Sequence, residues 1–309
     1  MAQQEYRNRE DLFKDVVKTK YGYYQLKQKV TAEELALFYA ESYYQNDTSV
    51  YRKQYAQKEL KNKRCRLQRM QKIAEREMQG KDSGKKFLDI GCGEGFALQY
   101  FMEQGYDVTG IEYDVHGCEY HNPQVVDKIY KGDSYTVLSQ FERQSYSGLI
   151  LMDNVLEHVL DPECFIQKVT DVARPGTCLI INVPNDFSDT QLMLYEKGKI
   201  DHPFWVTVSS YPPEHISYFN KDALEKLLNA YGWSMAYIMG SYPIDFNLFN
   251  DHTNYIRNPQ KGRDCYETML EIEALMEELD PAADILTDLY GRLGKAGLGR
   301  GLTGFFILR

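Results

Sequence analysis

Acidic residues placed within or after apolar runs are the side chains of this sequence best suited to bind a ligand. Residues 87–95 read FLDIGCGEG, an apolar run that contains Asp89 and passes into Gly91, Gly93 and Gly95. A short apolar run bounded by turn residues predicts a buried strand, and glycine is required where backbone takes a positive φ or closely approaches a ligand. The carboxylate would repel a phosphate and attract a cation. The segment therefore predicts a turn that binds a cationic ligand.

A second acid lies where a nucleotide site would need one. Residues 107–114, DVTGIEYD, predict a strand that ends at Glu112. In a βαβ unit, an acid about 20 residues beyond the glycines accepts hydrogen bonds from ribose hydroxyls. The glycine spacing differs from the G-x-G-x-x-G fingerprint of dinucleotide sites. The sequence therefore gives little support to an NAD-dependent dehydrogenase.

The segments around these residues alternate between predicted strands and predicted helices. A helix at 96–105 follows the glycines, and Asp161-Pro162 has the residue types of a helix start, because aspartate caps a helix and proline suits its first turn. Such alternation predicts a parallel sheet with helices on both faces. Strands are expected at 87–90, 107–112, within 125–133, and at 149–152, 177–186, 233–241 and 302–309.

Residues 1–84 look helical and polar, and we expect them to form an extension. Thr31 and Glu34 have the spacing of a capping box ahead of a helix. The segment 51–79 is rich in lysine and arginine with a thin apolar stripe, which predicts a second helix. A solvated surface helix is the favoured interpretation of its charges. The alternative is that its Arg and Tyr side chains close over a cofactor or an anionic substrate.

Two further segments would surround a ligand. Residues 185–219 are predicted to be irregular, and a helical insert is predicted before the last strand. Both would leave the sheet at the carboxyl ends of strands, where open α/β sheets bind ligands. We therefore expect both segments to be the substrate lid and the specificity determinants. Candidates for binding a phosphate or carboxylate of the substrate are Arg257, Lys261, Arg263 and Arg300, with surface charge as the alternative. The expected parts of the chain are 1–84, 85–244, 245–301 and 302–309.

Composition and charge restrict the class of protein. Hydrophobic residues make up 43% of the 309 residues, as in ordinary globular chains, and the formal charge of −9 argues against a nucleic-acid partner, which needs a basic surface. The six cysteines have no metal-type spacing, which indicates reduced thiols and a cytoplasmic location. We find no apolar run that suits a membrane span and no signal pattern. The 25 tyrosines fit either packing or a pocket for sugars and rings.

These motifs together resemble the class I S-adenosylmethionine (SAM)-dependent methyltransferases of the small-molecule type. The resemblance covers residues 85–240 and rests on LDIGCGEG, GIEYD, LILMDNVLEHVLDP, ARPGTCLIINVPN and the EHISYF-to-LLNAYGW tail, in that order. It implies a Rossmann-like, doubly wound, seven-stranded sheet whose last strand is antiparallel and follows the helical insert. Stretches near both chain ends are similar to extensions of bacterial methyltransferases that decorate surface glycans and specialised metabolites.

The resemblance also implies which residues bind SAM and its product S-adenosylhomocysteine. The glycine turn would line the methionine end, and Glu112 would bind both ribose hydroxyls. Tyr113 would pack on the adenine, and the residues after the third and fourth strands would meet the adenine edge and the methionine group. The implied cofactor residues are Asp89, Gly91, Cys92, Gly93, Gly95, Glu112, Tyr113, Asp133, Ser134, Asp153 and Asn154.

Two histidines are candidates for the base that methyl transfer would need. The reaction is an in-line displacement that requires alignment of the nucleophile with the methyl carbon and, for a hydroxyl or amine acceptor, removal of a proton. His158 and His215 are the candidate catalytic residues, because imidazole titrates near neutral pH, and Glu157 lies beside His158. The alternative is that Glu157 and His158 anchor a lid by hydrogen bonds.

A metal-dependent mechanism is an alternative with less support. In the ubiquinone-pathway O-methyltransferases and the small-RNA 3′-terminal methyltransferases, a Glu-x-x-Glu-His segment ligates a divalent ion. The similar segment here begins with Asn154 and ends with Glu157 and His158. One carboxylate is thus missing from a site for a hard cation, and we expect no metal.

The expected function is transfer of a methyl group from SAM to an oxygen, ahead of nitrogen or carbon, of a sugar, sugar nucleotide, glycan or natural-product intermediate. An RNA or protein methyltransferase and a non-catalytic SAM-binding protein are the alternatives. The expected partner is a small-molecule or glycan substrate, without a membrane, and a homodimer is left open.

Overall fold

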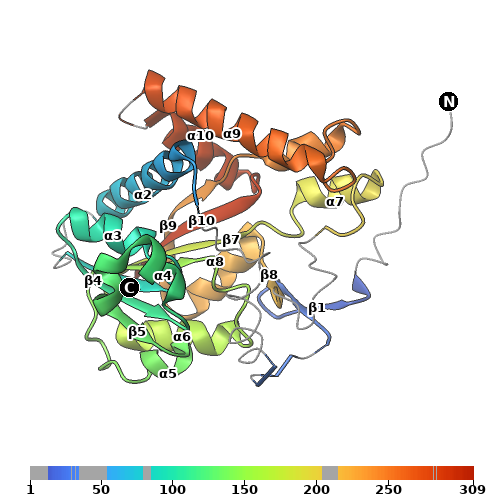
Figure 1. Ribbon diagram of the computed structural model, residues 1–309. Coiled ribbons are helices and arrows are strands. Elements are labelled where there is room, and N and C mark those ends of the chain that lie inside the picture. The colour runs from blue at the N-terminus through green and yellow to red at the C-terminus, as the bar shows by residue number, and fades with distance from the viewer. Residues whose placement is uncertain are drawn as a thin grey trace, which may run out of the picture. The chain divides into compact units, whose positions relative to one another are not determined.

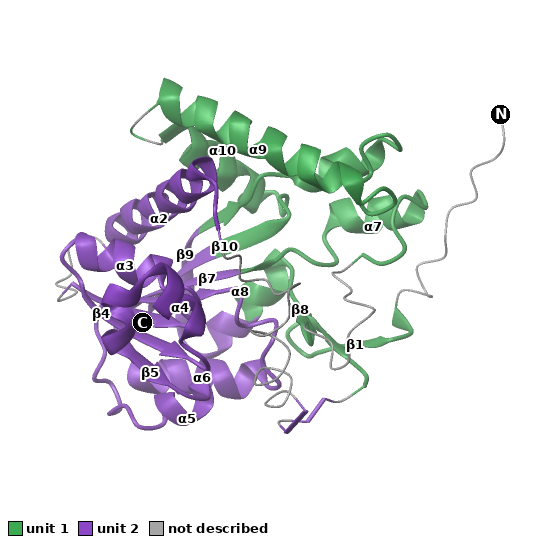
Figure 2. Cartoon of the chain, in the orientation of Figure 1, with its two compact units in different colours: residues 1–29, 183–226, 238–303 green, residues 30–182, 227–237, 304–309 purple. Residues whose placement is uncertain are grey.

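The computed structural model describes residues 13–28, 30–31, 33–34, 54–78, 85–203, 215–280, 282 and 284–309 (Figure 1). The chain divides into two compact units (Figure 2). Because the chain passes from one unit to the other several times, each unit is made of separate segments. Unit 1 consists of residues 1–29, 183–226 and 238–303, and unit 2 of residues 30–182, 227–237 and 304–309.

In the part of the chain that the structure describes, seven strands form one sheet in the order β5-β4-β3-β6-β7-β10-β9. The pairs β3/β4, β3/β6, β4/β5 and β6/β7 are parallel. The central strands are nearly continuous apolar runs, as expected for parallel strands buried on both faces. The strands are β3 Lys86–Ile90, β4 Asp107–Glu112, β5 Ile129–Lys131, β6 Leu149–Asp153, β7 Cys178–Pro184, β9 Trp233–Gly240 and β10 Gly301–Leu308.

Strand β10 runs antiparallel to both of its neighbours. The Gly176 N–H, just before β7, donates to Leu308 O at the end of β10. On the other side, the Arg309 N–H donates to Gly232 O before β9, and the Ser241 N–H after β9 donates to Gly301 O. In each of these pairs the start of one strand meets the end of the other, which confirms the predicted Rossmann-like sheet with an antiparallel last strand.

Some of the described helices begin at a side-chain cap, whereas others, α3 and α9 among them, begin without one. Helix α6 starts where predicted, because the Asp161 carboxylate accepts from the Cys164 N–H at 3.0 Å and Pro162 opens the helix. None of the described helices is both long and apolar enough to cross a membrane. The helices are α2 Gln57–Met78, α3 Phe96–Glu103, α4 His116–His121, α5 Ser134–Leu138, α6 Pro162–Val172, α7 Asp189–Glu196, α8 Lys221–Ala230, α9 Gln260–Leu279 and α10 Asp284–Lys295, with 3-10 turns η3 Pro123–Lys128 and η4 Ile244–Phe249.

The N-terminal extension is only partly helical. Strands β1 (Val16–Lys18) and β2 (Tyr24–Leu26) form an antiparallel hairpin, and β2 pairs with β8 (Ser217–Tyr218) in unit 1. The expectation of helix was wrong for this segment, because valine and tyrosine favour strands and Gly22 provides a turn at φ 96°. The prediction of a helix within 51–79 was correct, and this helix is α2.

Two other local predictions have clear outcomes. The capping box is confirmed, since the Thr31 N–H donates to Glu34 Oε2 at 2.8 Å and the Glu34 N–H donates to Thr31 Oγ1 at 3.2 Å; the body of that helix lies outside the described residues. The prediction that 185–219 is irregular was wrong in part. Ser188 caps α7 there, and β8 follows, whereas residues 204–214 lie outside the described range.

Candidate functional site

The turn after β3 requires its glycines. Gly91, Gly93 and Gly95 have φ values of 74°, 52° and 76°, a region that side chains with a Cβ adopt at a cost. A Cβ on Gly91 would lie 2.6 Å from Val155 Cγ2. The Gly91 and Cys92 N–H groups both donate to Ile111 O, at 2.8 and 3.2 Å. The turn is therefore held against the end of β4.

Two acids from neighbouring strands lie at this turn. Asp89 is 2% exposed, and its carboxyl pKa is raised well above 3.8 by burial and by the negative charges of Asp153 and Glu112. Glu112 Oε2 accepts from the Gly93 N–H at 2.6 Å, and its Oε1 accepts from the Tyr113 N–H at 2.7 Å. The backbone thus fixes one carboxylate beneath the turn while the other is poorly solvated. Such a concentration of negative charge favours a cationic ligand.

Arg66 of α2 contacts the third acid, at the end of β6. Its Nη2 donates to both oxygens of Asp153, at 2.6 and 2.7 Å. Asn182 Nδ2 donates to Asp153 Oδ1 at 2.9 Å and lies 3.1 Å from Asn154 Oδ1. The predicted site residues Asp153 and Asn154 therefore belong to one polar group, and the Asn154 amide is directed into it.

Sequence reasoning missed Arg66, because the charges of α2 were interpreted as a solvated face. The helical spacing contained a signal. Met70 and Ile73, four and seven residues further on, share the face of Arg66, and each is only 1% exposed. An arginine that shares a helix face with buried apolar residues is only partly solvated, which favours an anionic partner. The Arg66 side chain is 36% exposed, and its partner is Asp153.

The residues before α2 also contact the glycine turn. The Tyr55 hydroxyl donates to both oxygens of Glu94, at 2.9 and 2.8 Å, and His121 Nε2 lies 3.4 Å from Glu94 Oε1. Lys63 of α2 lies over the Tyr55 ring, 4.7 Å from its centroid. The start of α2 is therefore joined to the turn, and closure of its Arg and Tyr side chains over a cofactor stays a prediction.

Other predicted cofactor residues have identifiable local roles. Asp133 caps α5, with Oδ2 accepting from the Thr136 N–H and hydroxyl at 2.9 Å each, and Ser134 is the first residue of that helix. Cys92 is buried, and burial followed by the charges of Asp89 and Glu112 raises the pKa of its thiol. Contact of Asp133, Ser134 and Tyr113 with an adenine stays a prediction.

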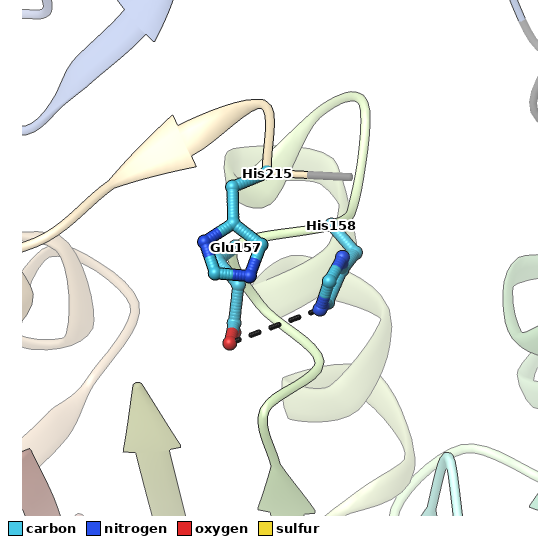
Figure 3. A group of neighbouring side chains, drawn as sticks. All are labelled: Glu157, His158 and His215. Atoms are coloured by element: carbon cyan, nitrogen blue, oxygen red, sulfur yellow. Dashed lines mark ion pairs between the residues drawn. The ribbon is translucent and has the colours of Figure 1, made fainter. Parts of the chain in front are cut away.

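The candidate catalytic residues come from two segments. Glu157 and His158 lie in the turn after β6, where Glu157 is 1% exposed and His158 Nε2 lies 3.9 Å from Glu157 Oε1 (Figure 3). His215, drawn in the same figure, belongs to unit 1, where its carbonyl accepts from the Tyr218 hydroxyl at 3.1 Å. His215 thus leads directly into β8.

Arg300, a weaker candidate for substrate binding, forms ion pairs with two carboxylates of unit 1. Its Nη1 lies 3.2 Å from Asp186 Oδ1, and its Nε lies 3.7 Å from Asp245 Oδ1. The Tyr255 hydroxyl donates to Asp245 Oδ1 at 2.7 Å. Because Asp186 and Asp245 are both buried, Arg300 neutralises carboxylates of the chain itself and joins the start of β10 to η4.

Residues 57–238, more than half of the chain, match the family described as "Methyltransferase domain". The ubiquinone biosynthesis O-methyltransferase of Pectobacterium atrosepticum is 28% identical over 96 residues, which are 30% of this chain and 40% of that protein. The human mitochondrial ubiquinone biosynthesis O-methyltransferase is 25% identical over 201 residues, which are 62% and 52% of the two chains. The chain thus spans about half or less of these relatives. A SAM-dependent methyltransferase structure from Archaeoglobus fulgidus has 16% identity and a TM-score of 0.48, covering 81% of this chain and 94% of that one.

Proposed function

The chain belongs to the methyltransferase-domain family, whose cofactor is SAM, and from this we propose that it transfers a methyl group to an oxygen of a small molecule. The arrangement that carries the proposal is the convergence of Asp89, Glu112 and Asp153 on the glycine turn. When bound, SAM supplies an electrophilic methyl carbon on a sulfonium. The chain's own residues would bind it, align the acceptor and remove the acceptor proton.

The residues at the turn fit the charges of this cofactor. Asp89 and Asp153 would attract its ammonium and sulfonium, because both acids lie at adjacent strand ends. Glu112, held by two backbone N–H groups, would accept from the ribose hydroxyls. Arg66, which lies beside Asp153, would form an ion pair with the methionine carboxylate. These roles follow from the sign of charge that each side chain carries.

His158 and His215 are the proposed candidates for the general base. The position of His158 next to a buried carboxylate supports the proposal, since a neighbouring acid fixes the orientation of an imidazole. Glu157 would act as the positioning residue. His215 is held by its backbone, through the Tyr218 hydroxyl and the pairing of β8 with β2.

Oxygen is the proposed acceptor atom, ahead of nitrogen or carbon, because the relatives described above are O-methyltransferases by name. A sugar, sugar nucleotide, glycan or natural-product intermediate is the proposed acceptor class. We also propose that the helical insert between β9 and β10 sets acceptor specificity. The six cysteines, all within the described residues, are free thiols, which supports a reducing compartment such as the cytoplasm.

The base proposal is tested by replacing each histidine singly. We expect His158→Ala or His215→Ala to lower turnover by about 100-fold or more, the usual contribution of general base catalysis, with SAM affinity retained. His116→Ala is the control, because His116 in α4 has a 76% exposed side chain. If both variants keep the turnover of His116→Ala, neither histidine is the base.

A further inference from the structure

Unit 1 contains a group of stacked aromatic rings that the cofactor site does not use. Tyr24 of β2 stacks on Phe187, with centroids 4.2 Å apart, and Phe13 stacks on Tyr24 at 5.5 Å. Tyr218 of β8 meets Phe187 edge-on at 6.2 Å. Phe13, the outer ring, is 36% exposed, whereas Phe187 and Tyr218 are buried. We call these four residues the aromatic group; its Phe13 ring is exposed at the surface and packs on the buried ring of Phe187.

The aromatic group is joined to a candidate catalytic residue. The Tyr218 hydroxyl donates to His215 O at 3.1 Å, and the Leu26 N–H at the end of β2 donates to Ile216 O at 3.1 Å. A molecule that stacked on Phe13 would therefore lie on the same small sheet that carries His215.

Phe187 itself has an unusual backbone. It lies three residues beyond β7 with φ 53°, which is a genuine outlier for a bulky residue. Such conformations persist only where surrounding structure enforces them, and they cluster at functional sites. Here the aromatic stack and the capped start of α7 at Ser188 hold it.

The hairpin that carries two of these rings is basic. Residues 13–28 contain four lysines and one aspartate, in a chain whose formal charge is −9. Lys18 Nζ lies 5.6 Å from the centroid of Tyr24, and Lys27 Nζ donates to Phe13 O at 3.0 Å and to Lys14 O at 2.7 Å. Lys27 thus braces the hairpin. Lys14 and Lys18 are exposed, and no carboxylate of the described residues pairs with either.

We propose that the aromatic group and Lys18 bind the acceptor, and that the acceptor is a sugar bearing phosphate. A sugar ring packs its C–H face on an aromatic ring, and an ammonium beside that ring attracts phosphate. The proposal rests on the proposed function and narrows its acceptor class. The phosphate has two sources, a sugar nucleotide or a simple sugar phosphate, and both present the same chemistry to Lys18.

The test measures binding of three probes to the full chain by NMR titration: UDP-glucose, glucose 1-phosphate and uncharged methyl glucoside. Phe13→Leu removes the exposed ring, with Tyr130→Leu as the control, because Tyr130 of β5 is an aromatic residue that is 53% exposed and lies outside the insert. Lys18→Gln removes the charge, with Lys226→Gln on the exposed face of α8 as its control. SAM affinity of every variant is measured alongside.

We expect Phe13→Leu to weaken binding of each bound probe about fivefold, the scale of a lost stacking contact. Lys18→Gln should weaken the phosphate-bearing probes about threefold or more and leave methyl glucoside unchanged. Preference for UDP-glucose over glucose 1-phosphate would identify a sugar nucleotide, and the reverse a sugar phosphate. Equal affinities of the variants and their controls, or no binding of any probe by a chain that binds SAM, would overturn the inference. Failure to bind SAM would instead count against the proposed function.

Discussion

Arg66 of α2 donates to both carboxylate oxygens of Asp153, at 2.6 and 2.7 Å. This contact joins a helix that precedes the sheet to the acid at the end of β6. Because Tyr55, just before α2, also bonds Glu94 in the glycine turn, the helix contacts the proposed cofactor site at two points. We therefore propose that the charge and position of α2 contribute to cofactor binding.

We predict that Arg66→Gln weakens SAM binding by about tenfold or more, the scale of a lost charge-assisted hydrogen bond. Arg64→Gln is a matched control on the same helix, because Arg64 forms an exposed pair with Glu103, and such pairs contribute little. Isothermal titration calorimetry measures both affinities. Equal affinities would mean that Arg66 only anchors α2.

Glycine at position 91 should be required for space as well as for backbone freedom. Gly105 has a similar φ of 79° with no atom within 4 Å of its Cβ position, so Gly105→Ala should cost about 1 kcal/mol for the left-handed conformation alone. Gly91→Ala should cost about 1–3 kcal/mol more through the contact with Val155. Urea unfolding measures both. If both variants lose the same free energy of unfolding, the contact with Val155 relaxes freely. If Gly91→Ala loses more, adding Val155→Ala should restore the difference.

The sheet and its glycine turn could be predicted from the sequence because their signals are local. The apolar run around Leu88 and the alternating glycines indicate a strand and a turn without reference to any distant residue. The N-terminal hairpin was missed since its strands are three residues each and depend on pairing with Ser217 and Tyr218, about 200 residues away.

The candidate site was predictable only for residues that stand at strand ends. Asp89, Glu112 and Asp153 end or interrupt apolar runs, so their position in the sequence indicates their position in the fold. Arg66 could not be placed with certainty, because the direction in which a helix face points is decided by tertiary packing. The partners of Arg300 could not be predicted either, because Asp186 and Asp245 are far from it in sequence.

Cofactor binding should release protons at pH values above 3.8, where the raised pKa keeps Asp89 protonated in the free protein. Burial and two neighbouring acids raise the pKa of the Asp89 carboxyl well above 3.8, so the free protein retains this proton as pH rises past that value. A bound cation favours the ionised form and lowers the pKa, so SAM affinity should increase with pH through this range. Calorimetry in buffers of different ionisation enthalpy measures the release. Asp89→Asn should abolish it; an unchanged release in that variant would assign it to another group.

The same shift has a consequence for stability without the cofactor. Because the folded pKa of Asp89 lies above the unfolded value, the folded state binds more protons between the two values. Its contribution to the free energy of unfolding therefore falls as pH rises from the unfolded to the folded pKa. Asp89→Asn should flatten the pH dependence of the urea midpoint over that window, and an unaltered dependence would contradict the raised pKa.

Arg300 should act on stability. Removing one partner of a buried ion pair leaves a buried charge uncompensated, so Arg300→Met should cost about 3–5 kcal/mol. Arg292→Met, which breaks an exposed pair with Asp288, should stay within about 0.5 kcal/mol of the wild type. Denaturant unfolding separates the two. If Arg300→Met keeps the stability of the wild type and raises the KM for the acceptor, Arg300 binds substrate and this prediction is wrong.

The central claim is tested most directly by incubating the full chain with methyl-labelled SAM and a panel of sugar phosphates and sugar nucleotides, followed by mass spectrometry. The account predicts label on a hydroxyl oxygen of a phosphate-bearing sugar, one S-adenosylhomocysteine for each methyl transferred, and loss of both products in Asp89→Asn. Label on nitrogen or carbon, or turnover in Asp89→Asn equal to that of the wild type, would contradict it.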